Sequence, residues 1–323
     1  MRKKFLSLFF GFICFFSCAC GFSACKKDDR PKIVVTVFPE YDWVINVLGD
    51  KKEKYDILLL QDSGTDLHNF QPTITDKGRI LDSTVFIYVG GESDAWAEEM
   101  LINNKIPSIV NLMSVLGDRA IEEEEIDGEE EHEHEHGEKE YDEHVWLSLK
   151  NARLFVGKIA EEFIRIDPEN ADIYRNNAAN YTAELTALDG KYERAAENKQ
   201  KDAIVVADRF PFLYLTRDYG ITYFAAFSGC SAETQVTPST VARLSEKVEE
   251  YGLNAVIKLE GSDGRCAIAV KNSTSNENLK ILTLDSMQTT TLKSGKTYLS
   301  VMENNLEVIK DALEVSATKE QGE

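Results

Sequence analysis

Two runs of alternating strand and helix patterns, separated by a long helical stretch, constrain the fold of this chain most strongly. In the first run, short apolar segments rich in β-branched residues alternate with segments of helical spacing. The expected strands are 33–38, 55–60, 85–89 and 108–112, and the expected helices are 41–48, 75–81 and 95–103. Because these strands show no polar alternation, we predict a parallel sheet that is buried on both faces.

The second run has the same character and follows two amphipathic helical stretches in 148–199. Its expected strands are 203–207, 222–227, 255–259 and 280–284, and its expected helices are 212–218, 238–251 and 298–313. Asp167-Pro168 separates the two helical stretches, since Asp can cap a helix and Pro suits its first turn. A helix over 168–199 would be about 45 Å long and could serve as a strut.

The predicted fold class is therefore α/β, with two lobes built on mainly parallel sheets and joined by a long helical strut. We expect an N-terminal lobe at 26–167, the connecting helix at 168–199 and a C-terminal lobe at 200–323. In such sheets ligands bind beyond the carboxyl ends of the strands, so the loops that follow strands are where binding residues are expected.

The first 25 residues have the features of a targeting segment, with a basic start, an apolar run and a small-residue stretch that ends at Cys25. This resembles a bacterial lipobox, with Cys25 as the lipidated first residue of the mature chain and Cys20 as second choice. The alternative is a retained membrane anchor, because the apolar run is nearly long enough to span a bilayer. Both interpretations place residues 26–323 outside the cytoplasm.

The formal net charge of −20 is concentrated in one segment. Residues 122–143 contain 14 acidic side chains and one lysine, so the remainder of the chain is only mildly acidic. No basic patch interleaved with aromatic residues is present in the sequence, and nucleic-acid binding is not expected.

Cys230 and Cys266 are the two cysteines that follow the leader and its Cys25. An oxidising compartment would permit them to form a disulfide, and the alternative is two buried free thiols. Either sulfur could also serve zinc as a thiolate, although a structural role is the favoured interpretation.

Two histidines stand in loops that suit a binding site. His68 lies in the sequence DLHNFQP, between an expected strand and an expected helix, and His144 lies in DEHVWLSLKNA, just before a helix. A lone histidine is more often structural than a metal ligand, so neither motif alone identifies a site.

Together, the two motifs resemble those of the zinc- and manganese-binding proteins of bacterial ABC importers. That family has a D-x-H-x-(F/Y)-x-P loop and a D-x-H-V-W-L-x-x-x-N-A segment, each of which donates a histidine to one metal ion. The resemblance extends over nearly the whole mature chain, including the strut helix and an acidic, histidine-rich loop. It implies that His68 and His144 are metal ligands.

The family takes its third ligand, His or Glu, from the start of the second lobe, where this chain has Arg209. Arginine cannot coordinate a cation, so the resemblance leaves the third ligand open between Asp208, Glu233, Glu260 and a water molecule. We expect Asp208 to substitute. The fourth family ligand is a carboxylate after the last strand, and Asp285 occupies the matching place.

Two imidazoles and two carboxylates suit zinc, and also harder ions such as manganese or iron. The run with His132, His134 and His136 contains an H-E-x-x-H string, but a block of like charge is normally solvated and does not form a protease site. We expect it to collect cations near the main site, with a plain solvated charge run as the alternative.

The resemblance implies a solute-binding lipoprotein with no catalytic activity that delivers a divalent metal to an ABC permease in the membrane. Zinc is the expected ion, with manganese or iron as the alternative. A stiff strut predicts little rotation between the lobes. The rival functions are a metallohydrolase that uses the same histidine and aspartate residues around a bound water, and a surface adhesin.

Overall fold

The fold is taken from a computed structural model that describes residues 28–124, 126, 140–230 and 235–316. The predicted leader with Cys25, the loop histidines His132, His134 and His136, and Glu233 lie outside the described residues. Among the described residues, no helix has the length and apolar character needed to cross a membrane.

Two four-stranded sheets, parallel throughout, form the framework and confirm the predicted fold class. The first has the order β2-β1-β3-β4 and the second the order β6-β5-β7-β8. The strands are β1 (Lys32–Val35), β2 (Asp56–Leu59), β3 (Val85–Tyr88), β4 (Ser108–Asn111), β5 (Ala203–Phe210), β6 (Thr222–Ser228), β7 (Ala255–Leu259) and β8 (Lys280–Leu284). Each sheet consists of strands from one of the two predicted runs.

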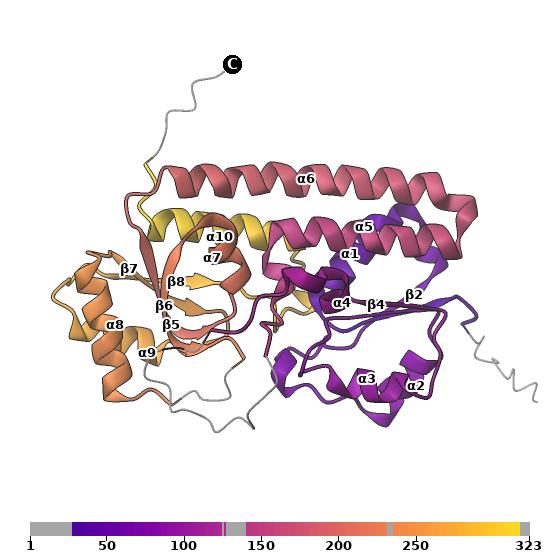
Figure 1. Cartoon of the computed structure of the whole chain (residues 1–323), viewed down its shortest axis with the longest axis horizontal. Coiled ribbons are helices and arrows are strands. Elements are labelled where there is room, and N and C mark those ends of the chain that lie inside the picture. Colours follow the sequence, from indigo (N-terminus) through magenta and orange to yellow (C-terminus); the bar gives the residue numbers. More distant parts are fainter. Residues whose placement is uncertain (1–27, 125, 127–139, 231–234, 317–323) are drawn as a thin grey trace, which may run out of the picture.

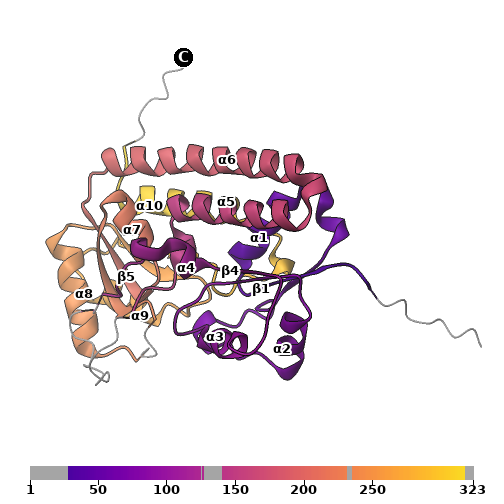
Figure 2. The same ribbon diagram turned by 45° about the vertical axis from the view of Figure 1, so that its right-hand side comes forward.

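Helices cover both faces of each sheet. They are α1 (Phe38–Leu48), α2 (Ile74–Leu81), α3 (Ala95–Leu101), α4 (Leu112–Leu116), α5 (Leu149–Ile166), α6 (Ala171–Glu197), α7 (Leu213–Tyr219), α8 (Pro238–Glu250), α9 (Arg265–Ser273) and α10 (Tyr298–Ala312). In Figures 1 and 2, α6 runs along one side of the molecule over α5 and α10, while α2 and α3 cover the far face of the first sheet and α8 and α9 that of the second.

The helical layer under α6 creates one apolar core that is shared by the two lobes. This core includes Ile33 of the first sheet, Val206 of the second, and Trp43, Leu185 and Met302 from α1, α6 and α10. Smaller separate cores lie under α2 and α3 and under α8 and α9. The lobes are therefore joined by a continuous buried surface as well as by the connecting helix.

Hydrogen bonds of tyrosine hydroxyls attach α6 to the neighbouring helices along its length. The Tyr181 hydroxyl donates to Asp42 of α1 at 2.8 Å, and the Tyr192 hydroxyl donates to the Met302 carbonyl of α10 at 2.6 Å. Asp189 accepts from the hydroxyl of Tyr219 in α7 at 2.8 Å. The predicted strut is thus confirmed as a helix of 27 residues that is hydrogen-bonded to both lobes.

The largest differences from the sequence expectations concern β5 and two helices, of which α4 follows an expected strand and was not predicted. Strand β5 continues to Phe210, three residues beyond its predicted end at Ala207, with an irregularity in its pairing with β6 between Val206 and Arg209. Helix α9 lies in a segment for which no helix was expected. Asp208-Arg209 looks like a polar loop in the sequence, but the pairing with β6 keeps it extended.

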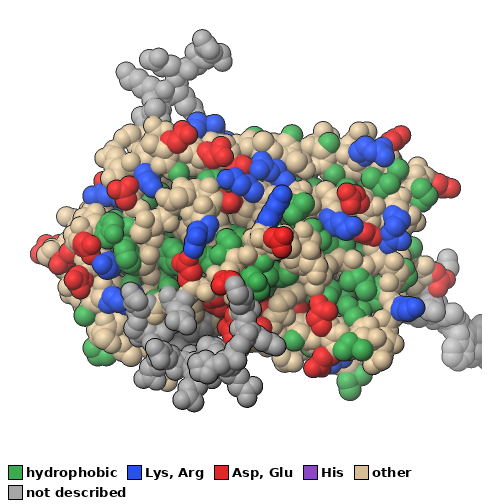
Figure 3. Space-filling view, in the orientation of Figure 1, with side chains coloured by type: hydrophobic (Ala, Val, Ile, Leu, Met, Phe, Trp, Pro, Cys, Tyr) green, Lys and Arg blue, Asp and Glu red, His purple; other side chains and the backbone are tan. Residues whose placement is uncertain are grey.

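One face of the molecule carries charged side chains of both signs. On the face shown in Figure 3, lysine and arginine side chains are interspersed with aspartate and glutamate, and apolar side chains show between them. Exposed charges of mixed sign contribute mainly to solubility.

Glu40 is a buried carboxyl group at the start of α1. One of its oxygens accepts hydrogen bonds from the backbone of Thr36 and Val37 and from the Thr36 hydroxyl, while the other has no partner among the described groups. Burial, followed by the repulsion of Asp94, raises the pKa of Glu40 to about 8. The charged form therefore destabilises the fold.

The raised pKa of Glu40 predicts that the unfolding free energy of the protein depends on pH. Because the folded-state pKa is raised, the contribution of Glu40 is fully present below the ordinary value of 4.5 and is lost as the pH rises through about 8. We expect the Glu40→Gln variant to lose less unfolding free energy than the parent between these limits, by on the order of a few kcal/mol. Urea unfolding at both pH values measures the difference.

The control for this experiment is Glu53→Gln on the exposed surface of the same lobe. The unfolding free energy of this variant should change with pH as that of the parent does. Equal pH slopes for parent and Glu40→Gln would show that Glu40 does not control this part of the profile.

Candidate metal centre

His68 is held at the carboxyl end of β2 by a short capped turn. It lies in a 3-10 helix (Leu67–Asn69) whose first turn is capped by Asp66, which accepts from the His68 backbone N–H at 3.1 Å. The ring Nδ1 is hydrogen-bonded to the Ser93 hydroxyl at 2.9 Å and lies 3.9 Å from a carboxylate oxygen of Glu143. With Nδ1 engaged, Nε2 is the ring nitrogen that faces His144.

His144 is fully buried and precedes a second 3-10 helix (Val145–Leu147). Asp142 accepts from its backbone N–H at 2.8 Å and contacts its ring Nδ1 at 3.1 Å. A proton on Nδ1 satisfies the carboxylate and leaves the Nε2 lone pair free, an arrangement common for histidines that bind metals.

The segment that carries His144 is fixed against the C-terminal lobe. Trp146 packs edge-on against the His144 ring, and its indole N–H donates to the Ser286 carbonyl at 2.8 Å. The Tyr298 hydroxyl donates to the Trp146 carbonyl at 2.6 Å, and that of Tyr214 to the Asp142 carbonyl at 3.0 Å. These bonds from α7, α10 and the loop after β8 set the position of the imidazole.

The two imidazoles meet through their Nε2 atoms, which are 3.2 Å apart. Two zinc–nitrogen bonds of about 2.0–2.1 Å at a tetrahedral angle place their nitrogens about 3.3 Å apart. The pair therefore already has the spacing of two ligands on one ion. The side-chain amide of Gln288, in the loop after β8, also contacts His144 Nε2.

The surroundings give the two rings different proton affinities. Burial, reinforced by His144, lowers the pKa of His68 well below its ordinary value, despite an opposing effect of Asp66. Burial would also lower the pKa of His144, but Asp142, Glu143 and Glu123 outweigh it and raise that pKa. His68 is thus held neutral, the form that coordinates metals.

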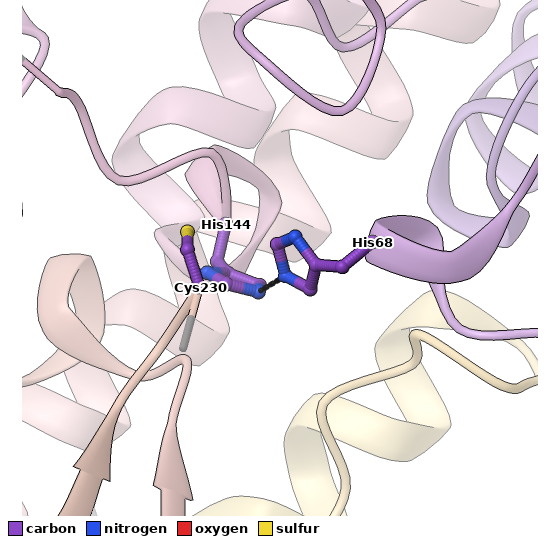
Figure 4. Close-up of side chains that lie close together, drawn as sticks. All are labelled: His68, His144 and Cys230. Atoms are coloured by element: carbon purple, nitrogen blue, oxygen red, sulfur yellow. Dashed lines mark hydrogen bonds between the residues drawn. The ribbon is translucent and has the colours of Figure 1, made fainter. Parts of the chain in front are cut away.

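Cys230 is the third potential ligand at this point. Within the described residues, His68, His144 and Cys230 form the one group of three or more His, Cys, Asp or Glu side chains whose donor atoms all lie within 4.8 Å of one another. Figure 4 shows the three side chains meeting from three segments of the chain. Cys230 follows β6, and its backbone N–H donates to Glu123 at 2.8 Å.

Arg209, at the position of the family's third ligand, forms an ion pair with Asp66. It lies in β5 of the C-terminal lobe, whereas Asp66 belongs to the turn that carries His68. The pair thus connects the lobes beside the histidines, and the carboxylate neutralises a cation that would otherwise repel a metal ion.

Asp208 is not brought to the histidines. Its carboxylate accepts from the backbone N–H groups of Arg209 at 3.1 Å and of Leu259 in β7 at 3.4 Å. Strand β5 extends through Asp208, and the carboxylate is held by these backbone N–H groups of the sheet, outside the group of donors around the histidines.

Asp285 is also engaged elsewhere. One carboxylate oxygen pairs with Lys296 at 2.6 Å, and the other accepts from the Met287 backbone N–H at 2.9 Å. Glu260, an alternative third ligand, accepts from the backbone and hydroxyl of Ser286. Neither carboxylate belongs to the group of donors around the histidines in the described structure.

Cys230 and Cys266 are both free thiols, so the disulfide considered from the sequence is absent between these two described residues. Cys266 lies in α9 and packs into the small core of the C-terminal lobe. From the sequence, Cys230 is a possible thiolate ligand, although a structural role is the favoured interpretation. The available signal was its place just after a predicted strand, at the sheet edge where ligands bind.

Comparison with known proteins finds relatives that are named for zinc uptake and zinc binding. Residues 33–312 match the family model described as zinc-uptake complex component A, periplasmic (ZnuA). The chain is 28% identical over 325 residues to the high-affinity zinc uptake system protein ZnuA of Bacillus subtilis, covering 98% of this chain and all of that one. It is 26% identical over 300 residues to the zinc-binding protein AdcA of Streptococcus pyogenes, covering 90% of this chain.

The chain spans only 57% of the length of that AdcA relative. Among solved structures, the Zn(II)-bound ZnuA-like domain of Streptococcus pneumoniae AdcA superposes with a TM-score of 0.69 at 25% identity, over 88% of this chain and 99% of that one. The family match covers most of the chain and both lobes. The chain therefore belongs to the ZnuA family of zinc-uptake components.

Proposed function

We propose that this protein is the solute-binding component of an ABC importer, which captures zinc outside the cytoplasm and delivers it to a membrane permease. The observation that carries the proposal is the pair of Nε2 atoms of His68 and His144, 3.2 Å apart and oriented by hydrogen bonds to Ser93 and Asp142. We propose both imidazoles as ligands of the ion.

The names of the relatives support zinc as the cargo. Manganese or iron is the alternative, since a site completed by oxygen ligands would select less strongly against harder ions. Asp285 could contribute such an oxygen only after leaving Lys296. Asp208, which faces the sheet, is not part of the proposed ligand set.

Anchoring and local enrichment complete the proposal. Cys25 would carry the lipid that holds the protein at the outer side of the cell membrane. His132, His134 and His136, in their acidic run, would collect zinc close to the main site. In this function the protein binds and releases an ion and makes no covalent change. A metallohydrolase would instead turn over members of ester and phosphate panels in the presence of zinc.

A growth experiment tests the delivery role. A strain that lacks the gene should grow poorly in zinc-limited medium, and the parent gene should restore growth. We expect His144→Ala to fail in this complementation, because the buried ligand pair is lost. Intracellular zinc, measured by mass spectrometry, should fall in parallel.

Asp208→Asn is the matched control, because it removes a carboxylate that the sequence favoured as a ligand but that faces the sheet. It should restore growth like the parent. Full growth with the His144→Ala variant would refute the delivery role. So would growth of the deletion strain that is independent of the zinc supply.

A further inference from the structure

The C-terminal lobe must supply its own donor if both lobes are to hold the ion, and Arg209 cannot do so. Arg209 is committed to Asp66 of the opposite lobe. The Asp208 carboxylate accepts from the backbone N–H groups of Arg209 and of Leu259 in β7. Strand β5 therefore contributes a cross-lobe ion pair to the site and no ligand.

The neighbouring strand offers the missing donor. β6 pairs with β5 in parallel, with Ser228 opposite Phe210, so the loop after β6 leaves the sheet beside the end of β5. Cys230 lies two residues beyond Ser228 in this loop. Its Sγ is within 4.8 Å of the donor nitrogens of His68 and His144.

The loop that carries Cys230 packs closely against Phe210 of β5 and against His144. A Cβ atom on Gly229 would lie 2.8 Å from the Phe210 carbonyl and 3.3 Å from the His144 ring and from Asp142. Only glycine leaves room for the loop to pack this tightly. The Cys230 backbone N–H is fixed in addition by Glu123, at 2.8 Å.

We propose that Cys230 is the third protein ligand of the ion, so that the site is a His₂Cys centre with zinc as its preferred cargo. This inference rests on the proposed function and specifies its ligand set. Zinc–sulfur and zinc–nitrogen bonds of about 2.3 and 2.0–2.1 Å set sulfur and nitrogen about 3.6 Å apart, so a displacement of about an ångström completes the contact.

Binding replaces a sulfur–hydrogen bond by a sulfur–zinc bond, and the thiol proton leaves to solvent. A thiolate favours zinc over manganese, which prefers oxygen ligands. The amide of Gln288 contacts His144 Nε2 and would have to give up this contact when the ion binds. With three protein ligands, the fourth position of a tetrahedral ion would be taken by water.

Cobalt substitution of the purified full chain tests this assignment. Bound Co²⁺ should give the intense near-ultraviolet sulfur-to-metal charge-transfer band in the parent and in Cys266→Ser, and no such band in Cys230→Ser. In chelator competition, Cys230→Ser should lose more zinc affinity than the roughly 100-fold that loss of an outer-sphere partner costs. The manganese affinity of the Cys230→Ser variant should change far less.

Cys266→Ser is the matched control, because it removes the other free thiol from the same lobe. Cys230→Ala, checked by circular dichroism, serves as a second variant that cannot donate an oxygen. A parent-like cobalt spectrum and zinc affinity in Cys230→Ser would overturn the assignment while leaving the proposed function intact. Stoichiometric zinc in both His68→Ala and His144→Ala would instead refute the proposed function.

Discussion

Replacing His144 with alanine is expected to abolish stoichiometric zinc binding by the purified protein. The imidazole is fully buried, and its Nε2 lies 3.2 Å from that of His68. Removal leaves Asp142 without its ring partner and the ion without a direct ligand, so the affinity should fall by more than about 100-fold. Metal analysis by mass spectrometry after gel filtration, followed by chelator competition, measures the loss.

The control removes residues 127–139 and joins Ile126 to Glu140. The backbone pairings of Glu122 with Tyr141 and of Glu123 with Glu140 lie outside the deletion and should keep the flanking segments in place. We expect this variant to retain one tightly bound zinc and to lose weakly bound ions only. The reverse pattern, with zinc kept by His144→Ala and lost with the loop, would place the main site in the acidic run.

Replacing Trp146 with alanine is expected to cost about 3–5 kcal/mol of unfolding free energy. The indole is fully buried in the core shared by the lobes, and its N–H is bonded to the Ser286 carbonyl. Trp146 also packs against His144, so the loss should loosen the segment that positions the ligand. Urea unfolding of the metal-free protein measures the change.

Phenylalanine variants separate the hydrogen bond from the packing. Trp43 is also fully buried in the shared core, but its indole N–H has no hydrogen-bond partner among the described groups. Trp146→Phe should therefore destabilise the protein by about 1–3 kcal/mol more than Trp43→Phe, because it leaves a buried carbonyl unpaired. Equal effects of the two variants would show that the bond to Ser286 contributes nothing to stability.

The fold was predictable because the period of apolar residues reports which faces are buried. Strands β7 and β8 begin and end at the predicted residues, and most other elements agree within a few positions. β5 was mispredicted because Asp208-Arg209 resembles a loop in isolation. Its extended conformation depends on pairing with β6, which is a tertiary interaction.

The candidate site was predictable only in part, because the placement of some of its residues also depends on tertiary interactions. His68 and His144 stand in motifs with distinctive neighbours, and the structure brings their rings together. Cys230 has no such motif, since its approach depends on the register of β6 and on the absence of a side chain at Gly229. The pairing of Asp285 with Lys296 likewise depends on how the loop after β8 folds.

Helix α6 is hydrogen-bonded to both lobes through its tyrosines, and this attachment affects the strength of metal binding. A protein that alternates between open and closed forms binds with an apparent affinity reduced by the fraction of molecules in the competent form. With both lobes attached to one helix and to one core, we expect that fraction to be close to one before the ion arrives. The intrinsic affinity of the ligand atoms is then expressed in full, and release requires a change in the ligand loops themselves.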